Sequence, residues 1–200
     1  MCACAVFMKR IGILGGTFNP IHIGHLAIAQ VAQDKFDLEK VVFVPSYRPP
    51  HKKIANLASA KDRFNMVRLS IKSNPRFEIS GFEIKKEGKS YTIDTVKHFR
   101  GLFPKKTKLF FIIGGDMAFD LYTWKDIKEI LKRVTFIVIN RPGHDDPKGK
   151  IKYLSAAMPG IDISSSYIRR CIIQRKSIKY LVPEGAFQYI KHHRLYRIHK

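Results

Sequence analysis

The glycine-rich segment at residues 15–26, GGTFNPIHIGHL, constrains the fold of this chain more than any other part of the sequence. It follows the apolar run at residues 11–14, which predicts a buried strand, and it leads into residues 26–32, which predict a helix. A strand, a glycine-rich turn and a helix form an anion-binding corner, because the first backbone N–H groups of a helix have no partner inside it. The segment therefore predicts an α/β fold with a phosphate site at this corner.

Two histidines, His22 and His25, lie in that corner. Imidazoles above a helix start suit an anion that gains charge during a reaction, and Gly24 between them permits close approach of a ligand or backbone. The segment is neither G-x-G-x-x-G nor the Gly-Lys-Ser/Thr of a P-loop, so neither of those phosphate mechanisms applies. A double glycine or a single histidine is usually structural. The order strand, GGTFNP, H-x-G-H, helix is what indicates a reactive site.

Length and hydrophobicity predict a single globular domain. The chain has 200 residues, of which 45% are hydrophobic, and no apolar run approaches the roughly 20 residues needed to cross a bilayer. Residues 1–7 lack the positive region of a signal peptide, and we expect them to form a disordered N-terminal extension before one domain over residues 8–200. Cys2, Cys4 and Cys171 give no disulfide framework, which favours a cytoplasmic location without a membrane partner.

The charge of the chain is its strongest compositional feature. The formal net charge is +21, and this value alone would fit a nucleic-acid-binding protein. However, the basic residues are dispersed, and no aromatic-interleaved patch accompanies them. A solvated basic surface on an enzyme with anionic substrates is therefore favoured, with no specific nucleic-acid partner, and nucleic-acid binding is kept as the alternative.

Apolar runs alternate with helix-like stretches along the chain. The runs that predict strands are residues 11–14, 41–45, 77–79, 82–84, 109–113, 134–139 and 161–163. The stretches that predict helices begin near residues 26, 59, 92, 116, 164 and 183, and the one from residue 116 extends to residue 131. This alternation predicts a single doubly wound, Rossmann-like α/β domain with a mostly parallel sheet and C-terminal helices. Its ligands are expected at the carboxyl ends of the strands, near a topological switch point.

Two further motifs follow expected strands. The first is Ile163 with three serines and Arg169, in which a capped helix start offers hydroxyl and N–H groups and a guanidinium can fork onto phosphate. The second is Gly114-Gly115-Asp116, in which a carboxylate can accept hydrogen bonds from ribose hydroxyls. A serine cap on a basic helix and an aspartate cap are the ordinary structural interpretations of these segments.

The motif GGTFNPIHIGHL resembles that of the HxGH nucleotidyltransferases, and the chain as a whole is most similar to the bacterial nicotinate-nucleotide adenylyltransferases. ISSSYIR is similar to the I-S-S-T-x-I-R motif of the family, with Ser166 in place of threonine. The stretches GGD…W, SYTIDT, PPHK and RPG also match, and the matches cover residues 10–195 in the order of the family. Asn19 stands where related enzymes often carry aspartate.

The resemblance implies a reaction and a set of site residues. Nicotinate mononucleotide attacks the α-phosphorus of ATP, giving nicotinate adenine dinucleotide and pyrophosphate, without a general base. The catalytic residues implied are His22, His25 and Arg169. Those implied for ATP are Gly15, Gly16, Thr17, Phe18, His22, His25, Gly114, Asp116, Ile163, Ser164, Ser165, Ser166 and Arg169. Those implied for nicotinate mononucleotide are His51, Lys52, Thr92, Asp116, Trp124 and Arg141.

Cofactor and acceptor follow from the same resemblance. We expect Mg²⁺ to be held mainly by substrate phosphates and water, with no protein metal site. An indole at Trp124 suits stacking on the pyridine ring, although a half-buried packing role is its ordinary interpretation. A sister adenylyltransferase that uses nicotinamide mononucleotide or phosphopantetheine is the alternative enzyme. Whether the chain forms a homo-oligomer is left open by the sequence.

Overall fold

The computed structural model describes residues 8–49, 56–140 and 151–197. The expected extension at residues 1–7 and three expected site residues, His51, Lys52 and Arg141, lie outside the described residues. The strands are β1 (Arg10–Gly16), β2 (Lys40–Pro45), β3 (Phe77–Ile79), β4 (Lys108–Gly114), β5 (Thr135–Asn140) and β6 (Leu154–Ala157).

These strands form one sheet in the order β3-β2-β1-β4-β5-β6, and each neighbouring pair is parallel. The prediction of a doubly wound, Rossmann-like α/β fold is confirmed. Strand order reverses between β1 and β4, so the switch point lies where the glycine-rich segment leaves β1.

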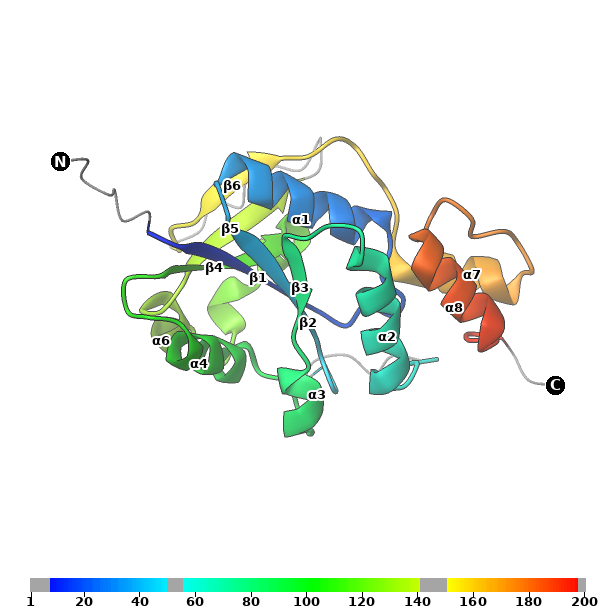
Figure 1. Ribbon diagram of the computed structural model, residues 1–200, viewed down its shortest axis with the longest axis horizontal. Helices are drawn as coiled ribbons and strands as arrows, with labels where there is room; N and C mark the ends of the chain where they lie inside the picture. The colour runs from blue at the N-terminus through cyan, green and yellow to red at the C-terminus, as the bar shows by residue number, and fades with distance from the viewer. Residues whose placement is uncertain (1–7, 50–55, 141–150, 198–200) are drawn as a thin grey trace.

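Helices cover both faces of the sheet (Figure 1). One face carries α1 (Ile23–Lys35), α2 (Ala60–Ile71), α7 (Ser165–Ile173) and α8 (Glu184–His192), whose buried side chains share one core cluster. The other face carries α4 (Thr92–Leu102), α5 (Gly115–Ala118), the 3₁₀ helix η1 (Leu121–Thr123) and α6 (Ile127–Leu131). Helices α7 and α8 lie beside α2 at one end of the molecule (Figure 1).

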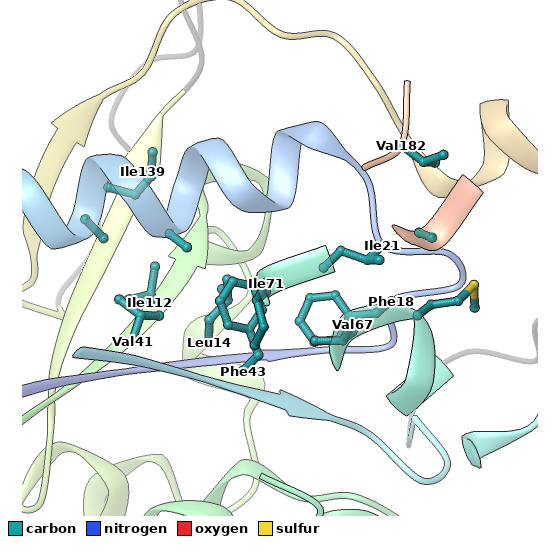
Figure 2. Close-up of a cluster of buried hydrophobic side chains, with 14 of the residues drawn as sticks. Leu14, Phe18, Ile21, Val41, Phe43, Val67, Ile71, Ile112, Ile139 and Val182 are labelled. Carbon is teal, nitrogen blue, oxygen red and sulfur yellow. The ribbon is translucent and has the colours of Figure 1, made fainter. Parts of the chain in front are cut away.

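Alternating side chains of the strands divide between the two cores. In β1, Ile11 and Ile13 join the cluster under α4, whereas Leu14 joins the cluster under α1 and α2. Figure 2 shows Leu14 with Phe43 of β2 and Ile112 of β4 in this second cluster. Near-continuous apolar strands follow from this arrangement, because a parallel sheet covered on both faces buries every residue.

The expected strand at residues 82–84 is wrong, because these residues lie in helix α3 (Phe82–Lys86). Tertiary contacts favour the helix. The Phe82 ring stacks on His98 of α4 with centroids 3.8 Å apart, and the buried carboxylate of Glu83 accepts a hydrogen bond from the Thr95 hydroxyl. Alternation of Phe82 and Ile84 in the sequence does not reveal these partners.

The expected strand at residues 161–163 is also wrong. The sixth strand is β6, an exposed edge strand without apolar alternation, which is why periodicity did not indicate it. Ile161 and Ile163 instead pack against the core in irregular backbone between β6 and α7.

The expected helix over residues 116–131 is broken into α5, η1 and α6. Trp124 ends η1 in extended backbone, and Asp126 adopts a left-handed conformation with φ of 55°. This bend turns the Trp124 ring edge-on against Phe111 and Phe136, at centroid distances of 6.0 and 5.8 Å. Packing of the indole against the sheet therefore overrides a continuous helix.

Candidate active site

The glycine-rich corner connects the end of β1 to the start of α1, as predicted. Phe18 turns the chain with φ of 49°, and its ring is buried under the corner. The edge of this ring contacts His25, at a centroid distance of 5.0 Å. Phe18 thus packs beneath the corner, and its side chain contacts His25.

The two histidine rings lie face to face, with centroids 3.7 Å apart and an interplanar angle of 32°. The backbone N–H of His22 donates to His25 Nδ1 at 3.2 Å. Because Nδ1 accepts this bond, the neutral His25 ring carries its proton on Nε2. His25 can therefore donate a hydrogen bond to a phosphate oxygen from Nε2 without first becoming a cation.

Gly24 allows the close packing of this pair. A Cβ atom at residue 24 would lie 3.1 Å from His22 Nδ1, which is tighter than ordinary van der Waals contact. A side chain there would displace the His22 ring. The glycine of H-x-G-H thus leaves room for the His22 ring, in addition to permitting the close approach of a ligand.

The start of α7 lies against the corner. The Ser165 hydroxyl donates to the Pro20 carbonyl at 2.8 Å, and Arg169 Nη1 donates to the Asn19 carbonyl at 2.7 Å. A second guanidinium nitrogen, Nη2, donates to the Ser166 hydroxyl at 3.2 Å. The structure thereby brings together the two motifs that the sequence separates most widely. The starts of α1 and α7 and the Arg169 guanidinium are thereby joined at one corner.

Ser164 plays the capping role predicted for it, since its hydroxyl accepts from the Tyr167 backbone N–H at 3.1 Å. Partial burial lowers the pKa of Arg169 from its ordinary value, and the nearby Tyr196 opposes that shift. Arginine stays protonated throughout the physiological range despite such a shift. Arg169 therefore supplies a fixed positive charge beside the corner.

Asn19 is a structural residue of the corner. Its Nδ2 donates to the Asn56 carbonyl at 3.2 Å, and its Oδ1 accepts from the Ala58 N–H at 3.0 Å and the Tyr196 hydroxyl at 2.9 Å. An amide satisfies both the donor and the acceptor roles, which an ionised aspartate cannot do. Asparagine at this position is therefore matched to its own surroundings.

The Gly114-Gly115-Asp116 segment ends β4, next to β1 in the sheet. A Cβ atom at Gly114 would lie 3.9 Å from Ile28 of α1, so this segment borders the helix that carries the histidines. A Cβ atom at Gly115 would lie 2.6 Å from Asn140 Oδ1, so any larger residue would displace the Asn140 side chain. Asp116 is exposed at this carboxyl edge of the sheet. Its location agrees with the expected ribose contact, which stays a prediction.

Two of the residues expected to hold the acceptor, Thr92 and Trp124, lie in the elements that cover the opposite face of the sheet from α1. Thr92 begins α4, and the Lys125 ammonium lies 4.6 Å from the ring centroid of Tyr91. This contact brings the start of α4 close to the segment that holds Trp124. Trp124 is half-buried and packs on the sheet, which is the ordinary structural role of such a residue. Its expected stacking on a pyridine ring stays a prediction.

The loop after β2 runs beside the same helix start. The Tyr47 N–H donates to the Ser90 hydroxyl at 3.0 Å, and the Ser90 N–H donates to the Arg48 carbonyl at 3.0 Å. The residues that precede the PPHK stretch are thus hydrogen-bonded to Ser90, two residues before Thr92. The loop residues His51 and Lys52 themselves lie outside the described residues.

Two residues that hold the corner were not predicted from the sequence. Arg63 lies on the buried face of α2 and is 1% exposed, and Tyr196 near the C-terminus is 8% exposed. A single arginine within the apolar face of the helix beginning at residue 60 was a usable signal for Arg63, because arginine is rarely buried unless it is paired. No local pattern marks Tyr196, whose partner Asn19 is remote in the sequence.

Neither a metal cluster nor a membrane-spanning helix occurs in the described part of the chain. No group of three or more histidine, cysteine, aspartate or glutamate side chains within residues 8–49, 56–140 and 151–197 could hold a metal ion. No helix among these same residues is long and apolar enough to cross a bilayer.

Comparison with known proteins agrees with this architecture. The cytidylyltransferase-like family model matches residues 13–171. Nicotinate-nucleotide adenylyltransferase of Thermoanaerobacter sp. (strain X514) is 41% identical over 199 residues, covering 94% of both chains. The enzyme of the same name from Lactiplantibacillus plantarum is 44% identical over 192 residues, covering 96% of this chain and 90% of the relative.

Solved structures show the same fold. Plasmodium falciparum nicotinic acid mononucleotide adenylyltransferase complexed with NaAD superposes with a TM-score of 0.78 at 22% identity, covering 94% of this chain and 97% of that chain. Its complex with APC gives a TM-score of 0.77 at 23% identity, with the same coverage. The family model and the curated relatives together establish that this chain is a nucleotidyltransferase of the nicotinate-nucleotide adenylyltransferase family.

Proposed function

We propose that this chain transfers the adenylyl group of ATP to nicotinate mononucleotide, in the synthesis of NAD. A phosphate oxygen of the mononucleotide forms a bond to the α-phosphorus of ATP, the bond from that phosphorus to the β-phosphate bridging oxygen breaks, and pyrophosphate leaves. The observation that carries the proposal is the junction of the H-x-G-H corner with the start of α7, through Ser165 and Arg169. Family membership supports the identity of the substrates.

Charge stabilisation and alignment account for the rate. The attacking phosphate is already anionic at neutral pH, so no base has to remove a proton. His25 donates from Nε2 to oxygens on the α-phosphorus, and His22 is assigned to the same triphosphate. The β- and γ-phosphates are assigned to Arg169 and to the helix start at Ser164–Ser166. Preorganised donors of this kind stabilise charge without reorganising during the reaction.

The rest of the ATP contacts come from backbone. The turn formed by Gly15, Gly16, Thr17 and Phe18 is assigned to the phosphates and ribose, because it precedes the start of α1. Gly114 and Asp116 are assigned to the ribose hydroxyls at the end of β4. Ile163 is assigned to the edge of the nucleotide, since it lies directly before the serine motif.

Mg²⁺ fits this site as an ion that arrives with its substrate. Mg²⁺ prefers oxygen ligands and keeps several waters, whereas the described side chains at the junction are His22, His25 and Arg169 with the serine hydroxyls. Triphosphate oxygens would therefore be its main ligands. When bound, the ion would neutralise charge on the phosphates and the leaving pyrophosphate.

The acceptor is assigned to the side of the site formed by Thr92, Trp124 and Asp116, with His51, Lys52 and Arg141 as further assigned contacts. A carboxylate is favoured over a neutral amide by the positive end of the α4 helix dipole, whose N-cap residue Tyr91 makes no side-chain cap bond. Helix α5, near Asp116, is only four residues long, so we assign this role to the start of α4.

A pyrophosphate-release assay tests the proposal directly. With ATP as donor, nicotinate mononucleotide should give the highest kcat/KM, followed by nicotinamide mononucleotide, and phosphopantetheine should give no turnover above background. Equal use of the acid and the amide would contradict the acceptor assignment. Turnover with phosphopantetheine alone would place the chain in a different branch of the adenylyltransferases.

The high positive charge is assigned to solubility and anionic substrates in the cytoplasm, without a specific nucleic-acid partner. Binding to random RNA or DNA should then be weak and should collapse on addition of salt. Tight, sequence-selective binding at physiological salt would favour the nucleic-acid alternative. Sedimentation of the pure protein would show whether it forms a homo-oligomer.

A further inference from the structure

Arg63 is the largest side chain that the described core buries completely. It lies on α2, is 1% exposed, and shares its face of the helix with Met66 and Val67. Burial lowers the pKa of its guanidinium, which Tyr196, Asp62 and Glu83 oppose. A buried cation is retained in a fold only where polar groups compensate for its lost hydration.

Four backbone carbonyls compensate Arg63. Its Nε donates to Ala58 O at 3.0 Å, and its Nη1 donates to Thr17 O at 2.8 Å and to Ser46 O at 2.6 Å. Its Nη2 donates to Tyr47 O at 2.8 Å. Thr17 belongs to the turn assigned to ATP, whereas Ser46 and Tyr47 begin the loop assigned to the acceptor side.

These bonds continue the sheet beyond its last strand pair. The ladder between β1 and β2 reaches Gly16 and Pro45, and the Ser46 N–H still donates to Gly16 O at 2.9 Å. One residue further, the two chains diverge. There Nη1 of Arg63 bridges the carbonyls of Thr17 and Ser46 and sets the separation of the two loops.

The same connection extends to α4. The Tyr47 N–H donates to the Ser90 hydroxyl, and the Ser90 N–H donates to the Arg48 carbonyl. A continuous route of hydrogen bonds therefore links the ATP turn, Arg63, the loop after β2 and the start of α4. A planar guanidinium fork fixes several directions at once, which an ammonium group does not do.

We propose that Arg63 is a positioning residue for adenylyl transfer, which fixes the turn at Thr17 relative to the acceptor loop at Ser46 and Tyr47. This inference rests on the proposed function for its substrates. Because Arg63 is 1% exposed and donates to backbone carbonyls, we assign it no direct contact with either nucleotide. Its loss should therefore disturb alignment of the attacking phosphate with the α-phosphorus more than the affinity for either substrate alone.

Arg63→Lys keeps the charge and removes the fork, and Arg68→Lys makes the same change at an exposed position of the same helix. We expect kcat of Arg63→Lys to fall about tenfold or more. A misplacement of the reacting groups by about 1 Å can lower the rate by roughly 10²-fold. Both KM values should change less than threefold, and Arg68→Lys should match wild type. Wild-type kcat in folded Arg63→Lys, or a loss that only follows the folded fraction in near-UV circular dichroism, would overturn the proposal.

Ser90→Ala provides the same test if Arg63→Lys does not fold. It removes the acceptor of the Tyr47 N–H, one link further along the route. We expect kcat to fall severalfold with both KM values nearly constant, and a wild-type kcat would overturn the proposal. Where both variants fold, the double variant should lose less than the product of the single losses, because coupled residues act on one route. Fully multiplicative losses would contradict a shared route.

Hydrogen exchange without substrate separates this inference from the proposed function. Arg63→Lys should speed exchange of the amides of Ser46 and Tyr47, whose N–H groups are bonded at this junction, and Arg68→Lys should leave them unchanged. Unchanged exchange in Arg63→Lys would overturn the inference. Absence of turnover with ATP and nicotinate mononucleotide in the wild-type protein would instead refute the proposed function.

Discussion

The two sides of the candidate site are held in different ways. On the ATP side, Arg63, Arg169, Ser165 and Asn19 all form hydrogen bonds between side chains and the backbone of the corner or its neighbours. On the acceptor side, the described side chain of Trp124 makes ring contacts with the sheet, and the Lys125 ammonium contacts the ring of Tyr91.

This difference matches the chemistry assigned to each side. Charge develops on the phosphates, and donors that are already fixed stabilise it at no cost in reorganisation. An aromatic ring is instead recognised by area and stacking, which tolerate small adjustments of the surrounding chain. Substitutions on the ATP side should therefore lower kcat, and substitutions on the acceptor side should raise the KM for the mononucleotide.

The largest effect is expected for His25→Ala. Loss of one preorganised donor to the α-phosphorus should lower kcat by roughly 10²-fold or more. The fold should survive, because the ring lies at the start of α1 and outside the buried core. Steady-state kinetics, with circular dichroism as the check on folding, measure this. His192→Ala, an exposed histidine on α8, is the control, and near-wild-type turnover of a folded His25→Ala would remove this histidine from the mechanism.

A smaller effect, on KM and not on kcat, is expected for Trp124→Ala. Loss of stacking worth about 0.5–1.5 kcal/mol should raise the KM for nicotinate mononucleotide by roughly two- to tenfold and change the KM for ATP little. Tyr122→Ala, at a neighbouring ring that is 72% exposed, serves as the control. A variant that loses ATP affinity instead would place Trp124 on the wrong side of the site.

Tyr196→Phe should cost stability more than activity. It removes the hydroxyl that donates to Asn19 Oδ1, and one such bond contributes about 1 kcal/mol to folding. The melting temperature should fall by about 2–4 °C with kcat lowered less than the His25 variant lowers it. Tyr180→Phe, at a ring that is 77% exposed, should change neither quantity. An unchanged melting temperature in Tyr196→Phe would show that the C-terminal segment does not support the corner.

The smallest effect is a pH dependence of stability on the acceptor side. Burial raises the pKa of Glu83, which Thr95 and Ser90 oppose by hydrogen bonding. A carboxyl whose pKa is raised in the folded state favours folding fully below its unfolded value of about 4.3, and this contribution is lost as the pH rises through the folded value. Glu83→Gln keeps an acceptor for Thr95 and removes the titration.

The difference in melting temperature, Glu83→Gln minus wild type, should therefore be larger at pH 7 than at pH 4. Thermal melts of both proteins across this range measure it. A difference that stays constant with pH would mean that Glu83 is solvated as in the unfolded chain. Glu83 would then not be a buried carboxyl between α3 and α4, and the acceptor side would lack this pH dependence.

Local sequence determined the ends of β2, β4 and β5 and the starts of α2, α4 and α7 closely, whereas β1 ends at Gly16 instead of residue 14 and α1 begins at Ile23 instead of residue 26. These elements carry strong periodicity and capping residues, such as Ser59 on α2 and Ser164 on α7, and such signals act within a few residues. Where they were absent or misleading, the predictions at residues 82–84, 116–131 and 161–163 were wrong. Contacts with other parts of the chain decided those segments.

The motifs by themselves determined the chemistry to be expected, because glycine, histidine, serine and arginine at helix starts are suited to phosphate whatever surrounds them. Only the tertiary structure decided how the motifs meet. The bonds from Ser165 to Pro20, from Tyr196 to Asn19 and from Arg63 to Thr17 join residues far apart in the chain. Such partners depend on how the strands order and the helices pack, so no local pattern of residues specifies them.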